Sequence, residues 1–256
     1  MKTSSKGPEV PILSIITVVR NGAATLEDCI RSVIERGTPA VEHIVIDGGS
    51  TDGTPAILSH HADAIACSIS EPDKGIYDAM NKGVRLAKGD WILFLGCDDT
   101  LAADLKGILP RLADRNTIYY GNAYFQQARR TYYGPFTAAK LALANLCHQA
   151  VFYPRPALLK HPFNLKYRIQ ADWEANMRCF SDPEFRFQYI PETIANYNDE
   201  SGTSSTQPDL DLEADYLPLL WRHFPVPVAL WRSAITLGGK ALRKLGWKGR
   251  QPYAKR

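Results

Sequence analysis

The strongest candidate for chemistry in this sequence is a pair of adjacent carboxylates, Asp98 and Asp99, which follows the apolar run WILFL at 91–95. Two carboxylates held together at the end of a buried strand repel each other and need a compensating cation. Mg²⁺ or Mn²⁺, bound by one or two carboxylates and by substrate phosphates, commonly fills this role. The same residues could instead form a solvated turn in which Asp99-Thr100 caps a following helix. The dipeptide alone leaves both interpretations open.

A glycine-rich segment, DGGSTDGT at 47–54, is the second candidate. Its glycines would let the backbone approach a flat base, and Asp47 could accept a hydrogen bond from a base N–H. Asp, Gly and Ser also dominate ordinary turns, so a turn without a ligand would look the same. The segment is not a phosphate-binding P-loop, because no G-K-[ST] follows it.

The elements that would position these residues alternate between strand and helix in the first part of the chain. Strands are predicted at 12–19, 43–46, 64–69 and 91–95, with helices at 25–36, from Thr54-Pro55 onward, and at 76–89, where Gly89 would end the helix. This alternation predicts a parallel sheet with crossover helices. Ligands of such sheets bind beyond the carboxyl ends of the strands. Thr17 to Asn21, Asp47 to Asp52, and Asp98-Asp99 all lie at predicted strand ends, so we expect them to converge.

The order of elements changes after residue 115. Strands are predicted at 117–125, 150–155 and 185–191, and a helix at 171–180. Two weakly patterned segments, 131–149 and 196–210, could form mobile loops over a site. Residues 216–246 are expected to be helical in part, interrupted by Pro225 and Pro227.

Length and composition favour a globular α/β protein. The chain has 256 residues and is 45% hydrophobic, enough for a full core. Its five cysteines are scattered without a C-x-x-C pair, so we expect neither a disulfide framework nor a structural zinc site. The segment MKTSSKGPEV lacks the apolar stretch of a signal peptide, and no run reaches the ~18 apolar residues of a membrane span. We therefore expect a cytoplasmic protein.

Charge divides the chain at Asp215. Residues 1–215 contain 21 basic and 27 acidic side chains, whereas residues 216–256 contain nine basic and no acidic ones. In the second segment, aromatic and aliphatic residues are mixed with Arg and Lys, which suits a helix on an anionic bilayer surface, here the inner face of the cell membrane. A helix packed on the domain with a solvated basic face is an equally good interpretation. Nucleic-acid binding is not expected.

Together these segments resemble the family 2 inverting glycosyltransferases of the GT-A fold, of the type found in bacterial polysaccharide biosynthesis. The resemblance rests on PILSIITVVRNGAATLEDCIRSV, HIVIDGGSTDGT, EPDKGIYDAMNKGVRLAKGDWILFLGCDD and ADWE, which occur in the family's order between residues 11 and 200. It implies a Rossmann-like, mixed and mostly parallel sheet flanked by helices. The domain would be 1–215, with a nucleotide-binding part at 11–115 and an acceptor and catalytic part at 116–215. Residues 216–256 would be a basic amphipathic helical extension.

The resemblance also implies roles for individual residues. Asp172 in ADWE would be the catalytic base, with Glu174 as a rival carboxylate. Asp172 could also simply be a helix N-cap, or a first-turn acid favoured by the helix dipole. Asp99 and Asp98 would bind Mn²⁺ or Mg²⁺. The residues expected around the nucleotide are Thr17, Asn21, Asp47, Asp52, Asp73, Lys74, Gly75 and Asp98. The residues expected near the acceptor are His148, Gln149, Trp173 and Glu174, and His148 could instead be a further metal ligand.

One departure from the family pattern concerns the metal site. A strict D-x-D motif has a carboxylate two residues before the second Asp, but here Cys97 and Gly96 precede Asp98-Asp99. The expected function is transfer of a sugar, with inversion, from a nucleotide-diphosphate donor to a saccharide or lipid-linked saccharide. A UDP-sugar is the favoured donor. A catalytically silent sugar-nucleotide-binding scaffold and a sugar nucleotidyltransferase are the alternatives.

Overall fold

A single mixed sheet organises the chain in the computed structural model, which describes residues 11–132, 134–200 and 208–244, with side chains as far as residue 239. The strand order is β3-β2-β1-β4-β8-β6-β9-β5, with β7 paired to β6. The strands are β1 (Leu13–Val19), β2 (Val41–Asp47), β3 (Cys67–Ser70), β4 (Trp91–Phe94), β5 (Thr100–Leu101), β6 (Thr117–Phe125), β7 (Arg130–Tyr132), β8 (Val151–Pro154) and β9 (Arg186–Tyr197).

Most of these strands run in one direction. Strands β3, β2, β1 and β4 pair in parallel, β8 is antiparallel to both β4 and β6, and β9 runs parallel to β6. Every residue of β1 is buried, as expected for a central strand covered on both faces. The predicted α/β class and mostly parallel sheet of the GT-A type are therefore confirmed.

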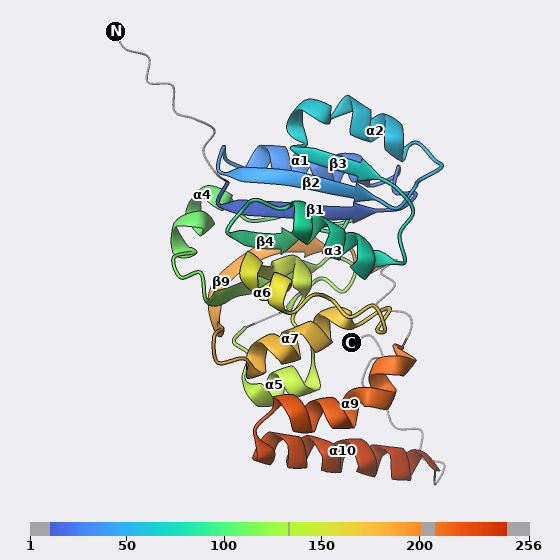
Figure 1. Cartoon of the computed structure of the whole chain (residues 1–256), viewed down its shortest axis with the longest axis vertical. Coiled ribbons are helices and arrows are strands. Elements are labelled where there is room, and N and C mark those ends of the chain that lie inside the picture. Colours follow the sequence, from blue (N-terminus) through green and yellow to red (C-terminus); the bar gives the residue numbers. More distant parts are fainter. Residues whose placement is uncertain (1–10, 133, 201–207, 245–256) are drawn as a thin grey trace.

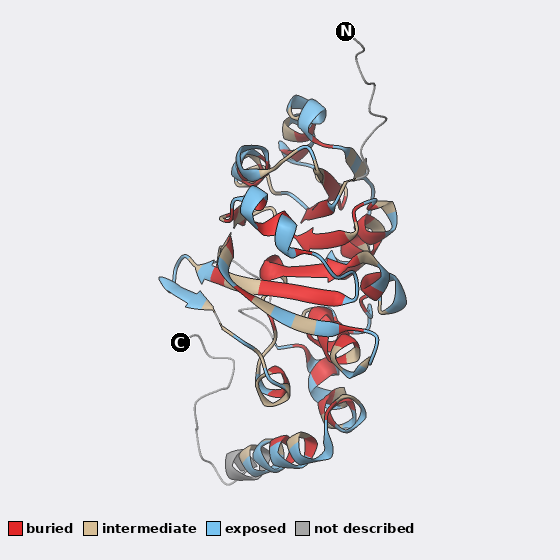
Figure 2. Ribbon diagram, turned by 90° about the vertical axis from the view of Figure 1, so that its left-hand side faces the viewer, coloured by how far each residue is buried: buried red, intermediate tan, exposed pale blue. Residues whose placement is uncertain are grey.

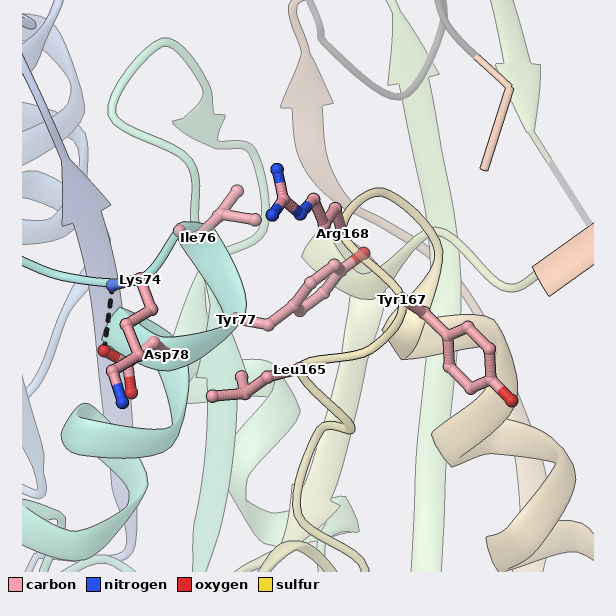
Figure 3. A pocket seen from close by; sticks show the side chains of 8 residues that line it. Lys74, Ile76, Tyr77, Asp78, Leu165, Tyr167 and Arg168 are labelled. Atoms are coloured by element: carbon pink, nitrogen blue, oxygen red, sulfur yellow. Dashed lines mark hydrogen bonds between the residues drawn. The ribbon is translucent and has the colours of Figure 1, made fainter. Parts of the chain in front are cut away.

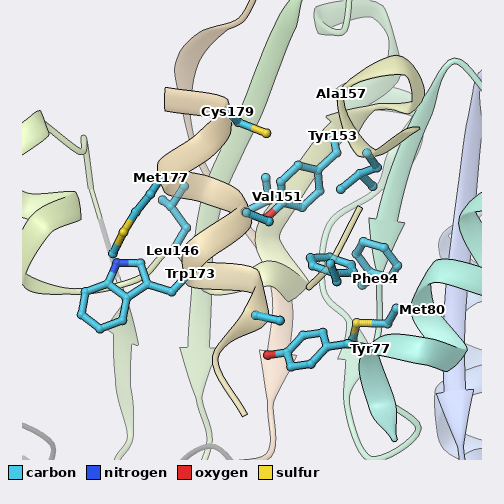
Figure 4. Packing of buried hydrophobic residues seen from close by; sticks show 14 of the residues in the cluster. Tyr77, Met80, Phe94, Leu146, Val151, Tyr153, Ala157, Trp173, Met177 and Cys179 are labelled. Carbon is cyan, nitrogen blue, oxygen red and sulfur yellow. The ribbon is translucent and has the colours of Figure 1, made fainter. Parts of the chain in front are cut away.

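Helices cover both faces of the sheet (Figure 1). They are α1 (Leu26–Arg36), α2 (Thr54–His60), α3 (Ile76–Leu86), α4 (Leu105–Ile108), α5 (Ala138–Leu143), α6 (Arg155–Lys160), α7 (Ala171–Ser181), α9 (Leu210–His223) and α10 (Val226–Lys244). One hydrophobic cluster packs α3, α6 and α7 against the sheet, and a second packs α1 and α4 against the other face. In the first, Trp173 and Met177 lie on one side of α7, and Tyr153 and Phe94 lie on the other side, toward the sheet (Figure 4). Figure 2 shows that much of the sheet is buried, so the loops that follow the strands begin at a packed core.

Several predicted elements differ in extent from the observed ones. Helix α3 ends at Leu86, before Gly89, whose backbone lies so close to Ser14 that a Cβ would meet it. Residues 131–149, expected to be loop, contain α5 and the start of a 3₁₀ turn at His148–Ala150. Asp99-Thr100 does not cap a helix, because Thr100 begins the short strand β5. Strand β9 extends six residues beyond the predicted end, to Tyr197.

The C-terminal part consists of two helices separated at Phe224-Pro225, as the prolines predict. Residue 215 lies inside α9, so the change of charge does not coincide with the end of an element. All five cysteines are free thiols. Within the described residues, no helix is long and apolar enough to cross a membrane.

Candidate active site

The carboxyl ends of β1, β2 and β4 meet at one edge of the sheet. The parallel register pairs Val19 with Asp47 and Ile16 with Phe94, so the segments that follow these strands emerge side by side. Figure 1 shows β1 and β2 pointing to the same side of the molecule. The predicted convergence of these strand ends is therefore observed.

The segment after β2 is ordered around Asp47, whose carboxylate is fully buried. It accepts hydrogen bonds from the Ser50 backbone N–H at 3.0 Å and from the hydroxyls of Ser50 and Ser70, both at 2.5 Å. Because these donors occupy both carboxylate oxygens, Asp47 fixes the shape of the glycine-rich loop from within. A direct contact of Asp47 with a base stays a prediction.

Asn21 and Asp52 tie this loop to the end of β1. The Asn21 side-chain oxygen accepts from the Thr51 backbone N–H at 2.9 Å, and Asp52 accepts from the Ala23 backbone N–H at 3.0 Å. The Gly22 N–H donates to the Thr54 hydroxyl at 3.0 Å. These bonds run in both directions between the two loops, so the loops form one rigid wall.

Thr17 lies away from this wall. Its side chain is fully buried, and its hydroxyl lies 2.9 Å from His43 Nε2 and 3.6 Å from Cys29 Sγ of α1. Burial lowers the pKa of His43 to about 4, so the imidazole is neutral at physiological pH. The structure thus makes Thr17 part of the core between the sheet and α1 and does not bring it to the predicted nucleotide pocket.

Asp73 reaches the glycine-rich loop from the segment before α3. A Cβ on Gly48 would collide with Asp73 Oδ2, so only glycine leaves room for this carboxylate. Asp73 Oδ1 accepts from the Gly75 N–H at 2.8 Å, and the Lys74 N–H donates to Asp78 at 3.0 Å. The structure therefore brings the predicted 73–75 segment against the loop that follows β2.

A pocket of 210 Å³ opens beside this segment. Its lining comes from residues 74–78 and from Leu165, Tyr167 and Arg168 of the loop before α7. Figure 3 shows Tyr77 of α3 pointing toward this loop. No sequence pattern predicts a role for the 165–168 loop, because its residues match no motif and become neighbours of α3 only through the fold.

Asp98 and Asp99 fold back over Gly96. A Cβ on Gly96 would lie 2.5 Å from Asp99 Oδ2 and 3.0 Å from Asp98 Oδ1, so one oxygen of each carboxylate crowds the same point. Asp99 is almost completely buried and accepts from the Asn198 N–H at 2.8 Å and from Gln149 Nε2 at 2.9 Å. Burial, and then the neighbouring Asp98 charge, raise the pKa of Asp99 to about 6.

This pair fits a divalent cation. Two hard oxygen ligands lie together, and their mutual repulsion is the strain that a bound cation relieves. Among the described residues, no group of three or more His, Cys, Asp and Glu side chains gathers around a common point. Phosphate oxygens and water would therefore have to complete the coordination, as is usual for Mg²⁺ and Mn²⁺ at nucleotide sites.

Asp172 is a further buried carboxylate of the site. Oδ1 lies 2.8 Å from the Tyr77 hydroxyl and 3.0 Å from the Trp173 N–H. Oδ2 lies 2.8 Å from Asn145 Nδ2 and 3.0 Å from His148 Nδ1. Burial, and then the Asp172 charge, raise the pKa of Tyr77 well above its usual range, so its hydroxyl stays protonated. Asp172 lies in the first turn of α7, whose N-cap is Gln170, so the N-cap interpretation is wrong, whereas the predicted position of an acid in the first turn is observed.

The 3₁₀ turn His148–Ala150 connects two carboxylate centres, which are the Asp98-Asp99 pair and Asp172. His148 contacts Asp172, while the next residue, Gln149, donates to Asp99. Gln149 is buried behind Asp99 and positions that carboxylate, so its predicted contact with an acceptor is not supported.

Trp173 and Glu174 are turned away from the cluster. The Trp173 side chain is buried, and its Nε1–H donates to the Leu141 carbonyl at 2.8 Å. Glu174 Oε1 lies 2.8 Å from Arg178 Nε one turn along the same helix. Their predicted roles at the acceptor are therefore not supported, and Glu174 does not share the environment of Asp172.

Sequence comparison decides the family. The model of glycosyl transferase family 2 matches residues 14–179, which include both carboxylate centres. The chain belongs to glycosyl transferase family 2. It is a glycosyltransferase, and the resemblance seen in its motifs is confirmed.

Relatives of this family 2 glycosyltransferase include a PGL/p-HBAD biosynthesis glycosyltransferase of Mycobacterium tuberculosis. That protein is 37% identical over 205 residues, which cover 77% of this chain and 80% of the relative. The uncharacterized glycosyltransferase EpsJ of Bacillus subtilis is 29% identical over 185 residues, covering 70% of this chain and 53% of EpsJ.

Solved structures share the fold of this glycosyltransferase. S. aureus TarS in complex with UDP-GlcNAc superposes with a TM-score of 0.68 at 15% identity, covering 88% of this chain and 71% of that one. The mannosyltransferase PcManGT of Pyrobaculum calidifontis, in complex with GDP-Man and Mn²⁺, gives a TM-score of 0.60 at 16% identity, covering 96% and 78%. At these identities the likeness shows a common fold.

Proposed function

We propose that this enzyme transfers a sugar from a UDP-sugar to a hydroxyl of a saccharide or lipid-linked saccharide, with inversion at the anomeric carbon. The observation that carries the proposal is the 3₁₀ turn whose adjacent residues, His148 and Gln149, contact Asp172 and Asp99. This short turn therefore lies between Asp172, a carboxylate suited to proton transfer, and Asp99, a carboxylate suited to a cation. Transfer from a nucleotide-sugar requires both functions close together.

In this proposal, Asp172 is the general base. The attacking hydroxyl must lose a proton, and a carboxylate within about 3 Å can accept it. The donors around Asp172 hold the carboxylate in place, and the hydroxyl replaces one of them when it approaches. Attack from the face opposite the leaving group then inverts the configuration in a single displacement.

The donor nucleotide is assigned to the wall built from the segments after β1 and β2, together with Asp73. Asn21 and Asp52 keep this wall in shape, and Lys74, which is exposed, is available to a phosphate group. Asp99 and Asp98 would hold Mn²⁺ or Mg²⁺. A divalent cation, when bound, supplies electrostatic stabilisation of the negative charge on a departing diphosphate. The complexes of TarS with UDP-GlcNAc and of PcManGT with GDP-Man and Mn²⁺ support a nucleotide-sugar and a divalent cation.

Release of the nucleotide product tests the proposal. Purified enzyme is incubated with UDP-, GDP- and dTDP-sugars with and without Mn²⁺, and the nucleotides released are identified. We expect UDP from one UDP-sugar, and we expect UDP with Mn²⁺ to raise the melting temperature, because a ligand bound only by the folded state stabilises it. Release of GDP alone would contradict the UDP assignment. Release of pyrophosphate would indicate a nucleotidyltransferase, and binding without turnover would indicate a scaffold.

The close contact at Gly48 gives a further prediction. In Gly48→Ala, the new Cβ must displace the Asp73 carboxylate. We expect the KM for the donor to rise about tenfold, which corresponds to ~1.4 kcal/mol of binding. Gly107→Ala is the matched control, because a Cβ there meets no atom within 4 Å. Equal donor KM values for the two variants would contradict a role for the contact between Gly48 and Asp73 in donor binding.

A further inference from the structure

Helix α10 is attached to the domain along one face. Ala229, Arg232 and Ser233 are buried, and Arg232 Nε donates to the Ala142 carbonyl at 3.1 Å and to the Tyr216 hydroxyl at 3.0 Å. The Arg232 guanidinium also lies over the Tyr216 ring, 5.2 Å from its centroid. These contacts fix the rotation of α10 about its own axis.

Helix α9 links α10 to the catalytic helix. The Tyr216 ring lies 5.5 Å from that of Trp173, and Phe224 stacks on Phe180 at 5.9 Å. Asp209 caps α9 and accepts from the Ile169 N–H at 2.8 Å. Both helices are therefore packed on the rest of the domain. In α10, only one side takes part in this packing.

The opposite side of α10 is apolar and exposed. Val226 and Leu230 are four residues apart, as are Trp231 and Ile235, so these side chains form two rows on the exposed half of the helix, which together we call the apolar stripe. Their exposed fractions are 59%, 53%, 42% and 46%, and Leu237 further along the helix is 54% exposed. Figure 2 shows this helix at the lower end of the molecule, with much of its surface exposed. An apolar stripe of this extent on the solvent-exposed surface of a protein indicates an interaction site.

Charge identifies the kind of partner. No acidic residue occurs after Asp215, and the last residues of α10 and the segment beyond it carry seven basic residues, namely Lys240, Arg243, Lys244, Lys248, Arg250, Lys255 and Arg256. Apolar and Trp side chains on a helix that continues into a basic segment match a bilayer interface with anionic headgroups. A second copy of the chain would bring a second set of these positive charges, and their repulsion opposes self-association.

We propose that α10 docks on an anionic lipid bilayer, with Val226, Leu230, Trp231, Ile235 and Leu237 inserted at the interface. This docking goes beyond the proposed reaction and does not depend on it. Helix α10 ends on the side of the molecule toward which β1 and β2 point (Figure 1). Docking would therefore place the C-terminal end of α10 on the same side of the molecule as the active-site loops.

Vesicle binding by the full-length chain tests this proposal. Wild type and the double variant Trp231→Ser/Ile235→Ser are sedimented with vesicles of phosphatidylcholine alone and with vesicles containing about one third phosphatidylglycerol. We expect wild type to bind the anionic vesicles, to bind less at high salt, and to lose at least about tenfold in affinity in the double variant. The control is Ile34→Ser/Leu159→Ser, which removes two similarly exposed apolar side chains from α1 and α6.

Point variants are preferable to truncation, because removing α10 would take away the Arg232 hydrogen bonds to Ala142 and Tyr216, and removing α9 as well would uncover Trp173 and Phe180. An unchanged melting temperature and unchanged donor turnover in solution show that the double variant is folded. Equal vesicle binding by wild type and the double variant would overturn the proposal, as would absence of wild-type binding to anionic vesicles. A wild-type dimer that the double variant converts to a monomer would also overturn it, because a second copy would then cover the stripe.

Discussion

Asp172→Asn is expected to lower kcat by about 10²–10⁴-fold, the usual contribution of a positioned general base. The amide has nearly the shape of the carboxylate, so its oxygen can still accept from the Tyr77 hydroxyl and the Trp173 N–H. It cannot take a proton from an attacking hydroxyl. The steady-state rate with saturating donor and acceptor measures the loss, and calorimetric binding of UDP is expected to be unchanged, since Asp172 belongs to the other carboxylate centre.

Glu174→Gln is the matched control for this experiment. It removes the second carboxylate of ADWE, which is equally buried but pairs with Arg178. We expect it to affect the melting temperature more than kcat, because its partner is structural. If Asp172→Asn keeps the wild-type rate, or if Glu174→Gln loses as much kcat as Asp172→Asn, then Asp172 is not the base.

The parts of the site that could be predicted from sequence lie at strand ends. An apolar run followed by Asp or Asn marks where a strand stops, and parallel strands bring such residues to one edge. This reasoning located Asn21, Asp47, Asp98 and Asp99. It misplaced Thr17, because β1 is apolar on both faces and its sequence gives no sign of which face Thr17 occupies.

Residues brought in from distant segments could not be predicted in this way. Tyr77 is 95 positions from Asp172, and Asn145 is 27 positions away in a segment expected to be loop. His148 and Gln149 were predicted near the acceptor, but only the 3₁₀ turn reveals that they face different carboxylates. Local patterns specify elements well, whereas the contacts of a turn depend on the packing around it.

The C-terminal charge pattern leaves open whether this segment packs on the domain or binds a membrane surface. In the structure, the two sides of α10 differ in a way that relates to each interpretation. One side of α10 packs on α9 and α5 through Ala229 and Arg232, whereas the other exposes Leu230 and Trp231. Composition alone could not separate them, because it does not show which residues of the helix are buried. The orientation of the helix is set by the single buried Arg232, which hydrogen-bonds to the Ala142 carbonyl.

Asp99→Asn is expected to lower activity by at least about 10²-fold, because a cation contributes several kcal/mol of charge stabilisation and ~1.4 kcal/mol equals a tenfold change in rate. The same change should not weaken the metal-free fold. The pKa of Asp99 is about 6 in the folded state against an ordinary value of 3.8, so the folded state holds this proton more tightly than the unfolded state. The contribution of Asp99 to stability therefore decreases as pH rises from about 4 to 6, and above pH 6 the buried charge is a full penalty.

The raised pKa of Asp99 can be tested by measuring the melting temperature, which does not depend on turnover. Without metal at pH 7.5, the melting temperature of Asp99→Asn should equal or exceed that of wild type, by up to a few degrees, and the difference should vanish near pH 4. Adding Mn²⁺ with UDP at pH 7.5 should stabilise wild type much more than the variant, and this stabilisation should weaken below pH 6, where protons compete for Asp99. The exposed Asp63→Asn serves as the matched control and should follow wild type throughout. If the metal-free variant is clearly less stable than wild type above pH 6, Asp99 is a structural residue that stabilises the fold, and the cation must be bound elsewhere.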